Sequence, residues 1–295
     1  MMLLLSVISV LFGVTLSQTT DDLNALYQTT LHLTNKDPTW SKLTPACQWK
    51  GITCSKNGHV VQIGWSGLHL GGYANLTTLP QKLRMFDLSH NQLRGNVNFA
   101  TLPQGLQVLY LSSNQLTGPL NFATLPRGLK QLGLNSNQLT GIPNFAALPP
   151  GLQQLGLNNN QLVGSPNFAT LPAGLQQLAL NNNQLTDTPN FAKLPPGLRY
   201  LYLSGNQLTG NVNLTTLPQG LVYLDISSNQ LTGNPILATL PPGLLYLYLH
   251  NNTFTGSPNL STLPQELAVL YLYNNNFTRS GTFTPHSKVG ASLRS

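Results

Sequence analysis

Charged side chains are scarce in this sequence of 295 residues, and their scarcity excludes several classes of protein. Only 7% of the residues are Asp, Glu, Lys or Arg, against about 25% in typical globular domains. The net charge of +7 comes from 14 basic and 7 acidic residues. The basic residues are scattered, with no stripe or cluster of the kind that binds phosphate backbones. We therefore expect no nucleic-acid partner, and solubility must come from Asn, Gln, Ser and Thr.

Cysteine is also scarce, since Cys47 and Cys54 are the two in the chain. In an exported protein an isolated close pair is most simply a disulfide. The chain-entropy model gives so short a loop a stabilisation of about 2.5 kcal/mol. A metal site is the alternative, but His59 is the one further ligand nearby. We expect a disulfide, with no metal and no other cofactor.

Long apolar runs are missing after the first 17 residues, so we predict no transmembrane helix in the mature protein. Residues 1–17 form an apolar run that ends in small residues, which is typical of a secretory signal peptide cleaved near Ser17, although the usual basic start is missing. A membrane anchor is the alternative. Residues 284–295 are polar and basic and are expected to form a disordered tail without a lipid-anchor signal. These features predict a secreted or extracellular surface protein.

The dominant feature of the chain is an asparagine that recurs every 23 residues. Around it runs a frame of leucines, complete in Leu106-x-x-Leu109-x-Leu111-x-x-Asn114-x-Leu116. Self-similarity at a fixed period of about 20–50 residues indicates a solenoid of stacked coils. We interpret the asparagine as structural, because an inward amide can satisfy backbone groups of its own turn and of the next coil. The nine positions are Asn91, Asn114, Asn137, Asn160, Asn183, Asn206, Asn229, Asn252 and Asn275.

The frame also locates a first coil that lacks the asparagine. Val60, Ile63 and Trp65 match the leucine positions, and Leu68 stands 23 residues before the first asparagine. We therefore expect ten coils over residues 60–283, with a parallel β-sheet on the concave face. The second half of each coil carries a spine residue followed by Leu-Pro, so it should be extended or turn-like and not helical. The spine positions are Phe99, Phe122, Phe145, Phe168, Phe191, Leu214, Leu237, Leu260 and Phe283.

Residues 18–59 are expected to form an N-terminal cap, because the first coil would otherwise expose its apolar end to water. Apolar residues at helical spacing predict a helix over residues 21–35, with Thr20 or Asp21 as its N-cap. The helix is followed by the motif Cys47-x-Trp49-x-Gly51-x-x-Cys54.

With this cap and these repeats, the chain resembles extracellular leucine-rich repeat proteins. The cap is similar to that of plant receptor-like proteins and receptor kinases, whereas the Leu-Pro-x-Gly-Leu and Asn-x-Leu-Thr-Gly repeats resemble surface antigens of kinetoplastid protozoa. The plant period is usually about 24 residues with an Ile-Pro after the Gly, and here Ile142-Pro143 is the one close match. The resemblance implies a leucine-rich repeat solenoid of the α/β horseshoe class and a non-enzymatic protein that binds other molecules. Receptor signalling is not implied, because the chain shows no kinase.

Alternate side chains of each strand point to the concave face, because the frame leucines point inward. The middle coils are uncharged there, with Gln beside Gly or Ala. The C-terminal coils carry seven tyrosines and one acid, which we predict to be a binding patch for a protein or a glycan. The alternative is that these tyrosines merely stack as good strand formers. The candidate residues are Tyr200, Tyr202, Tyr223, Asp225, Tyr246, Tyr248, Tyr271 and Tyr273.

Spacing along the solenoid argues against an enzyme. Asp87 and Asp225 lie six coils apart, or roughly 29 Å, whereas even inverting glycosidases place their carboxylates about 6.5–9.5 Å apart. His90 and His250 lie seven coils apart, roughly 34 Å, so they cannot share a metal ion. No phosphate-binding loop or nucleophile elbow is present. We therefore expect no catalytic residues.

Two functions remain, and five glycosylation sequons bear on them. One is a recognition module that uses the concave sheet, which the tyrosine-rich C-terminal coils favour. The other is a structural coat or decoy protein without a specific ligand, which the near-identity of the coils favours. A glycan beside the tyrosines would narrow access to them. The acceptor asparagines are Asn75, Asn213, Asn251, Asn259 and Asn276.

Overall fold

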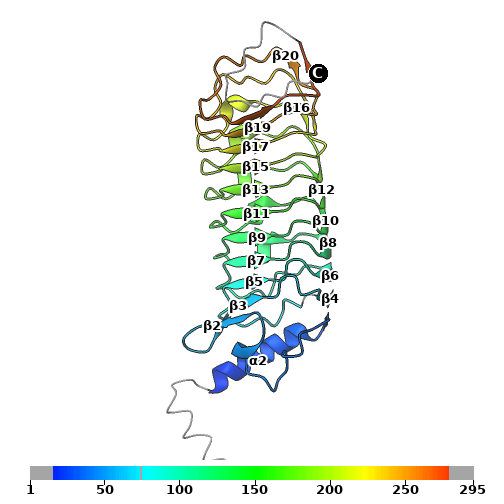
Figure 1. Cartoon of the computed structure of the whole chain (residues 1–295), viewed down its shortest axis with the longest axis vertical. Helices are drawn as coiled ribbons and strands as arrows, with labels where there is room; N and C mark the ends of the chain where they lie inside the picture. The colour runs from blue at the N-terminus through cyan, green and yellow to red at the C-terminus, as the bar shows by residue number, and fades with distance from the viewer. Residues whose placement is uncertain (1–15, 74, 279–295) are drawn as a thin grey trace, which may run out of the picture. The chain divides into compact units, whose positions relative to one another are not determined.

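The computed structural model describes residues 16–73 and 75–278, which form a β-solenoid of 23-residue coils preceded by a helix (Figure 1). The chain divides after Asn137 into two compact units, called unit 1 and unit 2 below. Most of the predicted signal peptide, the last spine position and the predicted tail lie outside the described residues. Within the described ranges, no helix is both long enough and apolar enough to cross a membrane.

Unit 1 holds the N-terminal cap and the first four strands of the repeat. Its elements are α2 (Leu16–Thr30), β1 (Leu33–Thr34), η1 (Ala46–Gln48), β2 (Ile52–Cys54), β3 (Val60–Gly64), β4 (Gly71–Tyr73), β5 (Met85–Asp87), β6 (Gln92–Asn96), β7 (Val108–Tyr110), β8 (Gln115–Pro119), η2 (Phe122–Thr124) and β9 (Gln131–Gly133). The main sheet has the order β2-β3-β5-β7-β9, antiparallel at β2 and parallel afterwards. A second sheet has the order β1-β4-β6-β8.

Unit 2 continues the same pattern with six main-sheet strands. Its elements are β10 (Gln138–Gly141), η3 (Phe145–Ala147), β11 (Gln154–Gly156), β12 (Gln161–Gly164), η4 (Phe168–Thr170), β13 (Gln177–Ala179), β14 (Gln184–Leu185), η5 (Phe191–Lys193), β15 (Tyr200–Tyr202), β16 (Thr209–Asn211), η6 (Leu214–Thr216), β17 (Tyr223–Asp225), β18 (Gln230–Thr232), β19 (Tyr246–Tyr248), β20 (Thr255–Gly256), β21 (Val269–Tyr271) and β22 (Asn276–Phe277). The main sheet is parallel, with the order β11-β13-β15-β17-β19-β21. Smaller sheets join β10-β12-β14, β16-β18 and β20-β22.

The register of the main sheet confirms the 23-residue period. Gln154 lies opposite Gln177, and Gln177 lies opposite Tyr200. Four repeat strands in unit 1 and six in unit 2 make nine turns and the strand of a tenth. The frame leucines between these side chains are buried, as Leu178 and Leu201 show at 0% exposure, so each coil buries its apolar positions against its neighbours.

The repeated asparagine is buried at seven of its nine positions and half-buried at Asn229 and Asn275. Its side chain pairs with the preceding coil and not, as predicted, with the next. The side chain of Asn114 donates to the carbonyls of Leu88 in the preceding coil and of Leu111 and Ser112 in its own turn, at 3.0, 3.1 and 3.2 Å. Its Oδ1 accepts from the amide of Leu93, at 3.0 Å. Each asparagine therefore pairs backbone groups that the coil before it leaves open.

This direction explains why the first coil carries Leu68 at the asparagine position. Asn91 accepts from the amides of Leu68 and Leu70 at 3.1 and 2.9 Å, and it donates to the carbonyl of Trp65 at 2.8 Å. The backbone of the first coil is thus satisfied by the second. The first coil follows the cap, so no earlier repeat has backbone groups that an asparagine at position 68 would need to pair. An apolar residue is therefore tolerated at this position.

The second half of the coil departs from the prediction, because it contains short helical turns. Five single 3₁₀ turns, η2 to η6, begin at predicted spine residues. An asparagine caps each of them, as the side chain of Asn121 does by accepting from the amide of Ala123. The spine itself is confirmed over most of its length, from Phe99 at 2% exposure to Leu237 at 1%, while Leu260 is half-buried.

Helix α2 runs from Leu16 to Thr30 and not over residues 21–35, so the predicted bounds were wrong. Because the helix continues through Thr20 and Asp21, neither residue is its N-cap. Its C-terminal end is earlier than predicted because the following segment forms β1, which pairs antiparallel with β4. Leu33 is buried at 4% exposure in that strand, so its burial there competes with further helix.

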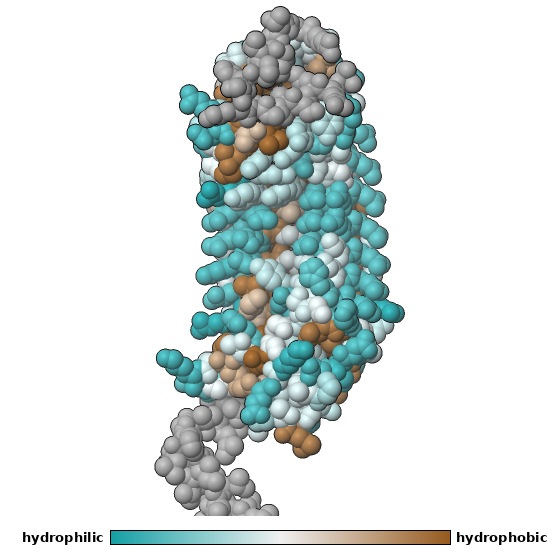
Figure 2. Space-filling view, viewed as in Figure 1, coloured by the Kyte–Doolittle hydropathy of each residue, from teal (hydrophilic) through white to brown (hydrophobic). Residues whose placement is uncertain are grey.

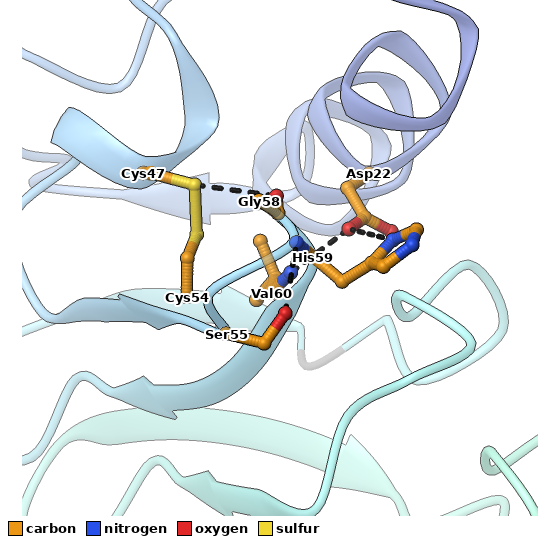
Figure 3. The surroundings of a disulfide bond; sticks show 7 residues. All are labelled: Asp22, Cys47, Cys54, Ser55, Gly58, His59 and Val60. Atoms are coloured by element: carbon orange, nitrogen blue, oxygen red, sulfur yellow. Dashed lines mark hydrogen bonds and ion pairs between the residues drawn. A yellow bond between two sulfur atoms is a disulfide. The ribbon is translucent and has the colours of Figure 1, made fainter. Parts of the chain in front are cut away.

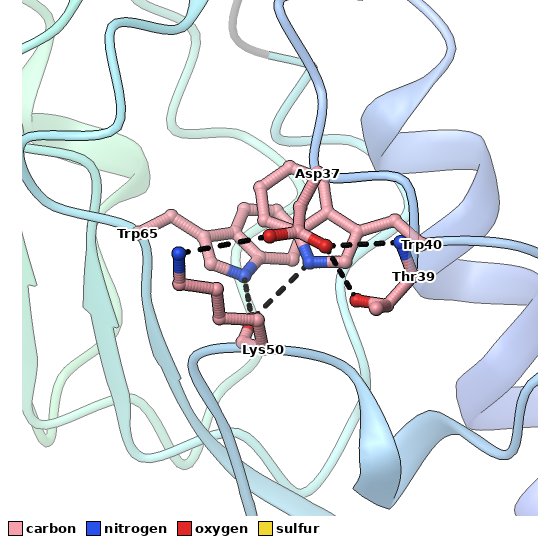
Figure 4. Close-up of polar contacts among 5 residues, drawn as sticks. All are labelled: Asp37, Thr39, Trp40, Lys50 and Trp65. Atoms are coloured by element: carbon pink, nitrogen blue, oxygen red, sulfur yellow. Dashed lines mark hydrogen bonds and ion pairs between the residues drawn. The ribbon is translucent and has the colours of Figure 1, made fainter.

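Two tryptophans, Trp40 and Trp65, meet at one backbone carbonyl of the cap (Figure 4). The indole nitrogens of Trp40 and Trp65 both donate to the carbonyl of Lys50, at 3.2 and 3.1 Å. The two rings lie 4.2 Å apart between centroids. The ammonium of Lys50 pairs with Asp37 at 3.7 Å, and hydrogen bonds from Thr39, chiefly from its hydroxyl, hold the pKa of Asp37 below its usual value.

The expected disulfide joins Cys47 to Cys54, whose Cα atoms lie 5.7 Å apart (Figure 3). Nearby, helix α2 is tied to the first coil by Asp22, which is 6% exposed. The Asp22 carboxylate accepts from the amide of Val60 at 2.9 Å and lies 3.5 Å from Nδ1 of His59. Among the residues with described positions, no group of three potential metal ligands occurs.

Candidate functional site

Seven of the eight candidate residues lie on the last four main-sheet strands of unit 2, β15, β17, β19 and β21, and Tyr273 lies two residues after β21. We call them the tyrosine patch: Tyr200, Tyr202, Tyr223, Asp225, Tyr246, Tyr248, Tyr271 and Tyr273. Tyr246 is exposed at 36%, and the other seven are half-buried. The leucines that alternate with them, such as Leu224, are fully buried. Alternation along each strand therefore presents these side chains on the outer face of the sheet.

The tyrosine rings form one continuous cluster across the strands. Centroids lie 4.5 Å apart between Tyr202 and Tyr223, 5.3 Å between Tyr223 and Tyr248, and 5.2 Å between Tyr248 and Tyr271. Tyr246 joins through Tyr223, at 5.7 Å. These are ordinary separations for aromatic pairs, which stabilise one another by about 0.5–1.5 kcal/mol beyond burial. The rings are therefore held in place before any ligand arrives.

The ring cluster differs from the list of candidates at two residues, Tyr200 and His250. Among the described residues Tyr200 makes no ring contact, although it lies opposite Tyr223 in the register. His250, which was not among the candidates, stacks on Tyr273 with centroids 4.6 Å apart and also contacts Tyr248 and Tyr271. Its position two residues after Tyr248 on an outward-facing register could have identified it from the sequence.

Electrostatics keep this surface largely uncharged. Burial, with Asp225 contributing, raises the pKa of Tyr202, Tyr223 and Tyr248 above the usual tyrosine value. Burial also lowers the pKa of His250, which Asp225 partly opposes. The phenols of these three tyrosines and the imidazole are therefore neutral at pH 7. The patch offers hydrogen-bonding groups on aromatic rings, with one carboxylate among them.

Asp225 is anchored by the turn that follows its strand. Its Oδ1 accepts from the amide of Ser227 at 3.0 Å and from the Ser227 hydroxyl at 2.6 Å. Asp87 in unit 1 has the same frame position, and its Oδ1 accepts from the amide of Ser89 at 2.8 Å. Both acids therefore have a local structural role.

The predicted glycosylation asparagines lie in two kinds of place. Asn75, Asn213 and Asn259 form turns in which Oδ1 accepts from both the amide and the hydroxyl of the residue two positions later. Asn251 is exposed after β19, where it donates to Ser228 and accepts from Asn274. Asn276 is exposed in β22. Attachment of sugar at any of the five stays a prediction.

Comparisons with known proteins agree with this architecture. The family description "Leucine Rich Repeat" matches residues 105–125, 197–217 and 220–240. No curated protein matches the chain by sequence. A solved structure of a plant ice-binding protein is similar, with 26% identity and a TM-score of 0.71 over 92% of this chain and 94% of that one.

Two plant receptor ectodomains are similar to the same degree. One is the leucine-rich repeat ectodomain of the Arabidopsis thaliana receptor kinase GASSHO1/SCHENGEN3, with 26% identity and a TM-score of 0.72 over 87% of this chain. The other is that of the Arabidopsis receptor kinase HAESA, with 26% identity and a TM-score of 0.71 over 89% of this chain. The chain spans 33% and 50% of their lengths. Its fold is a leucine-rich repeat solenoid, structurally similar to plant extracellular leucine-rich repeat ectodomains.

Proposed function

We propose that this chain is a secreted or cell-surface recognition protein that binds a protein or a glycan through the tyrosine patch, without catalysis. The observation that carries the proposal is the cluster of neutral, partly exposed tyrosine rings in contact across β15, β17, β19 and β21. Tyrosine is favoured in binding surfaces because it brings contact area and a hydrogen-bonding tip at low entropic cost. The disulfide in the cap and the predicted signal peptide support export.

Similarity to the receptor ectodomains supports the same proposal. The structures named above hold CASPARIAN STRIP INTEGRITY FACTOR 2 and an extended IDA peptide hormone ligand. A leucine-rich repeat ectodomain therefore binds a ligand in each of those proteins, and in HAESA this ligand is a peptide hormone. The resemblance of the repeats to kinetoplastid surface antigens stays a prediction, and so does the source of any partner.

Replacing Tyr202, Tyr223 and Tyr248 together by serine is expected to weaken binding at least about thirtyfold, because central aromatic side chains contribute about 2 kcal/mol or more each in such surfaces. The partner is taken from a binding screen of cell-surface proteins and glycans, and affinity is measured by surface plasmon resonance. Replacing the same three tyrosines by phenylalanine keeps the rings and removes the hydroxyls, so it shows how much each of the two contributes to affinity. Tyr110→Ser, at a main-sheet position in unit 1, is the control.

Unchanged affinity in the folded serine variant would remove the patch as the binding site. Thermal unfolding of each variant shows whether the solenoid persists. A screen that finds no partner would instead favour the structural coat or decoy function.

Ice binding is a second candidate, favoured by the ice-binding protein that matches this chain over nearly its full length. Hydrophilic side chains stand in regular rows on the surface (Figure 2). In unit 2 uncharged residues recur at 23-residue intervals, among them Gln207, Gln230, Thr209 and Thr232, all exposed. Such a repeating array of hydroxyl and amide groups can present an ordered set of hydrogen-bonding positions to a crystal surface.

Ice binding predicts that the protein slows ice growth in a freezing-point hysteresis measurement. Replacing Thr209 and Thr232 by tyrosine should abolish the effect, because bulky rings interrupt the row, while the tyrosine-patch variant should retain it. Ice growth that is as fast as in serum albumin at the same concentration would rule out the ice-binding function.

A further inference from the structure

We propose that the tyrosine patch takes a cationic group, the guanidinium or ammonium of an arginine or lysine side chain on a protein partner, at Asp225. This inference rests on the proposed recognition function and names the chemistry of its ligand. It is carried by the arrangement of rings around the carboxylate, by an unused carboxylate oxygen and by the negative charge that the rings and the carboxylate present together.

Aromatic rings flank the carboxylate on three sides. In the parallel register Asp225 lies between Tyr202 on one neighbouring strand and Tyr248 on the other. Tyr223 is two residues earlier on the same strand, so it shares the same face. Neighbouring strands lie about 4.8 Å apart, and the three rings contact one another at 4.5 and 5.3 Å between centroids. The carboxylate therefore lies within a frame of ring faces and edges.

One oxygen of this carboxylate remains available. Both hydrogen bonds from Ser227 go to Oδ1. Oδ2 takes part in no hydrogen bond or ion pair with any residue whose position is described. Asp225 is half-buried, so Oδ2 can accept from a ligand while the rings reduce its contact with water. A charge-assisted hydrogen bond formed there is stronger than one in open solvent.

The local charge at the patch, and not the net charge of unit 2, selects the sign of the ligand. Residues 138–295 hold three acids, Asp187, Asp225 and Glu266, and five lysines and arginines, of which Lys193 and Arg199 have described positions. Neither Lys193 nor Arg199 forms an ion pair with Asp225. The face of an aromatic ring carries partial negative charge, so rings and carboxylate together attract a cation and disfavour an anion.

Asp87 shows that the hydrogen-bonded turn after the strand does not by itself explain why tyrosines surround Asp225. It makes the same bond to the second following serine, yet its register neighbours are Gly64 and Tyr110, so one ring flanks it in place of three. The acid at this position is explained by the turn, but the turn does not need tyrosines around it. Asp87 is therefore a matched control within the same chain.

The test is a titration of the full chain with Nα-acetylarginine methylamide and with its citrulline counterpart, which keeps the shape of arginine but has no charge. Tyrosine ring signals are followed by NMR. The arginine probe is expected to shift the signals of Tyr202, Tyr223 and Tyr248. The affinity of the citrulline probe should be at least about tenfold lower. Asp225→Asn keeps an oxygen that can accept from Ser227, and it should lower the affinity of the arginine probe about tenfold. Asp87→Asn should leave this affinity unchanged.

The outcomes separate this inference from the proposed function. Equal binding of both probes, unaffected by Asp225→Asn, would overturn the cation site and leave a neutral patch, as for a glycan ligand. Absence of any shift with either probe would also overturn it, and the serine variant tested against the screened partner would then decide the recognition function by itself. Equal weakening by Asp87→Asn would show a general charge effect and would likewise reject the site.

Discussion

Replacing Asn206 by leucine is expected to lower the free energy of unfolding by about 3–5 kcal/mol. The Asn206 side chain donates to the carbonyls of Leu180 and Leu203, at 3.1 and 3.0 Å, and accepts from the amide of Leu185, at 3.0 Å. A leucine of similar volume fills the space but pairs none of these buried groups. Each unpaired group costs about 1–3 kcal/mol, so the sum is large even after partial relaxation.

The neighbouring residue offers a control of the same chemical kind. Gln207 is exposed, and Gln207→Leu should change stability by less than about 0.5 kcal/mol. Urea unfolding followed by circular dichroism measures both variants. Hydrogen exchange at the amide of Leu185 provides a local readout, because this amide loses its acceptor in Asn206→Leu alone. A loss below about 1 kcal/mol would mean that water replaces the amide, and the structural role of the asparagine would be overestimated.

Gly51→Ala is expected to have the second largest effect, a loss of about 2–5 kcal/mol. Gly51 has a φ of +81°, and a Cβ there would lie 2.3 Å from the carbonyl oxygen of Gly64 and 2.8 Å from the Trp65 ring. The oxygen belongs to the backbone of β3, and the amide of Gly64 donates to the carbonyl of Gly51 at 2.7 Å. Relieving the clash therefore separates the cap from the first coil.

Gly67 separates the two causes of this loss. It also has a positive φ, +67°, but a Cβ there would meet nothing within 4 Å. Gly67→Ala should therefore show the conformational cost alone, about 1–2 kcal/mol. Thermal unfolding of both variants, with tryptophan fluorescence reporting on the cap, measures the difference. Equal losses would indicate that the cap moves to accommodate the methyl group and does not depend on this contact.

Much of the fold could be predicted from the sequence because one physical pattern repeats. The leucine frame identifies the strands and the first coil at Leu68, since burial follows the period. The bounds of α2 could not be predicted in this way, because its end depends on pairing of Leu33 with a strand that is distant in sequence. The second sheet was missed for a similar reason, since its strands pair only once the coils are stacked.

The candidate site was predictable in its membership but not in its contacts. Alternation along the strands predicts that the tyrosines share one face, and their register and partial exposure agree with this placement, whereas their role in binding stays a prediction. Periodicity contains no information about rotamers, so it could not show that Tyr223 contacts three other rings or that His250 stacks on Tyr273. Nor could it show that one oxygen of Asp225 is used by Ser227 and the other is not.

The backward pairing of the repeated asparagine has a consequence for how such a chain can change in length. A 23-residue segment that is duplicated in frame brings its own asparagine, whose side chain can form hydrogen bonds with the backbone of the coil before it. The backbone groups of the new coil are in turn paired by the asparagine of the coil that follows. Asn114 and Asn206 make equivalent bonds ninety-two residues, or four repeats, apart. Copies of one repeat can therefore be inserted or removed between coils during evolution while every junction keeps the same hydrogen bonds.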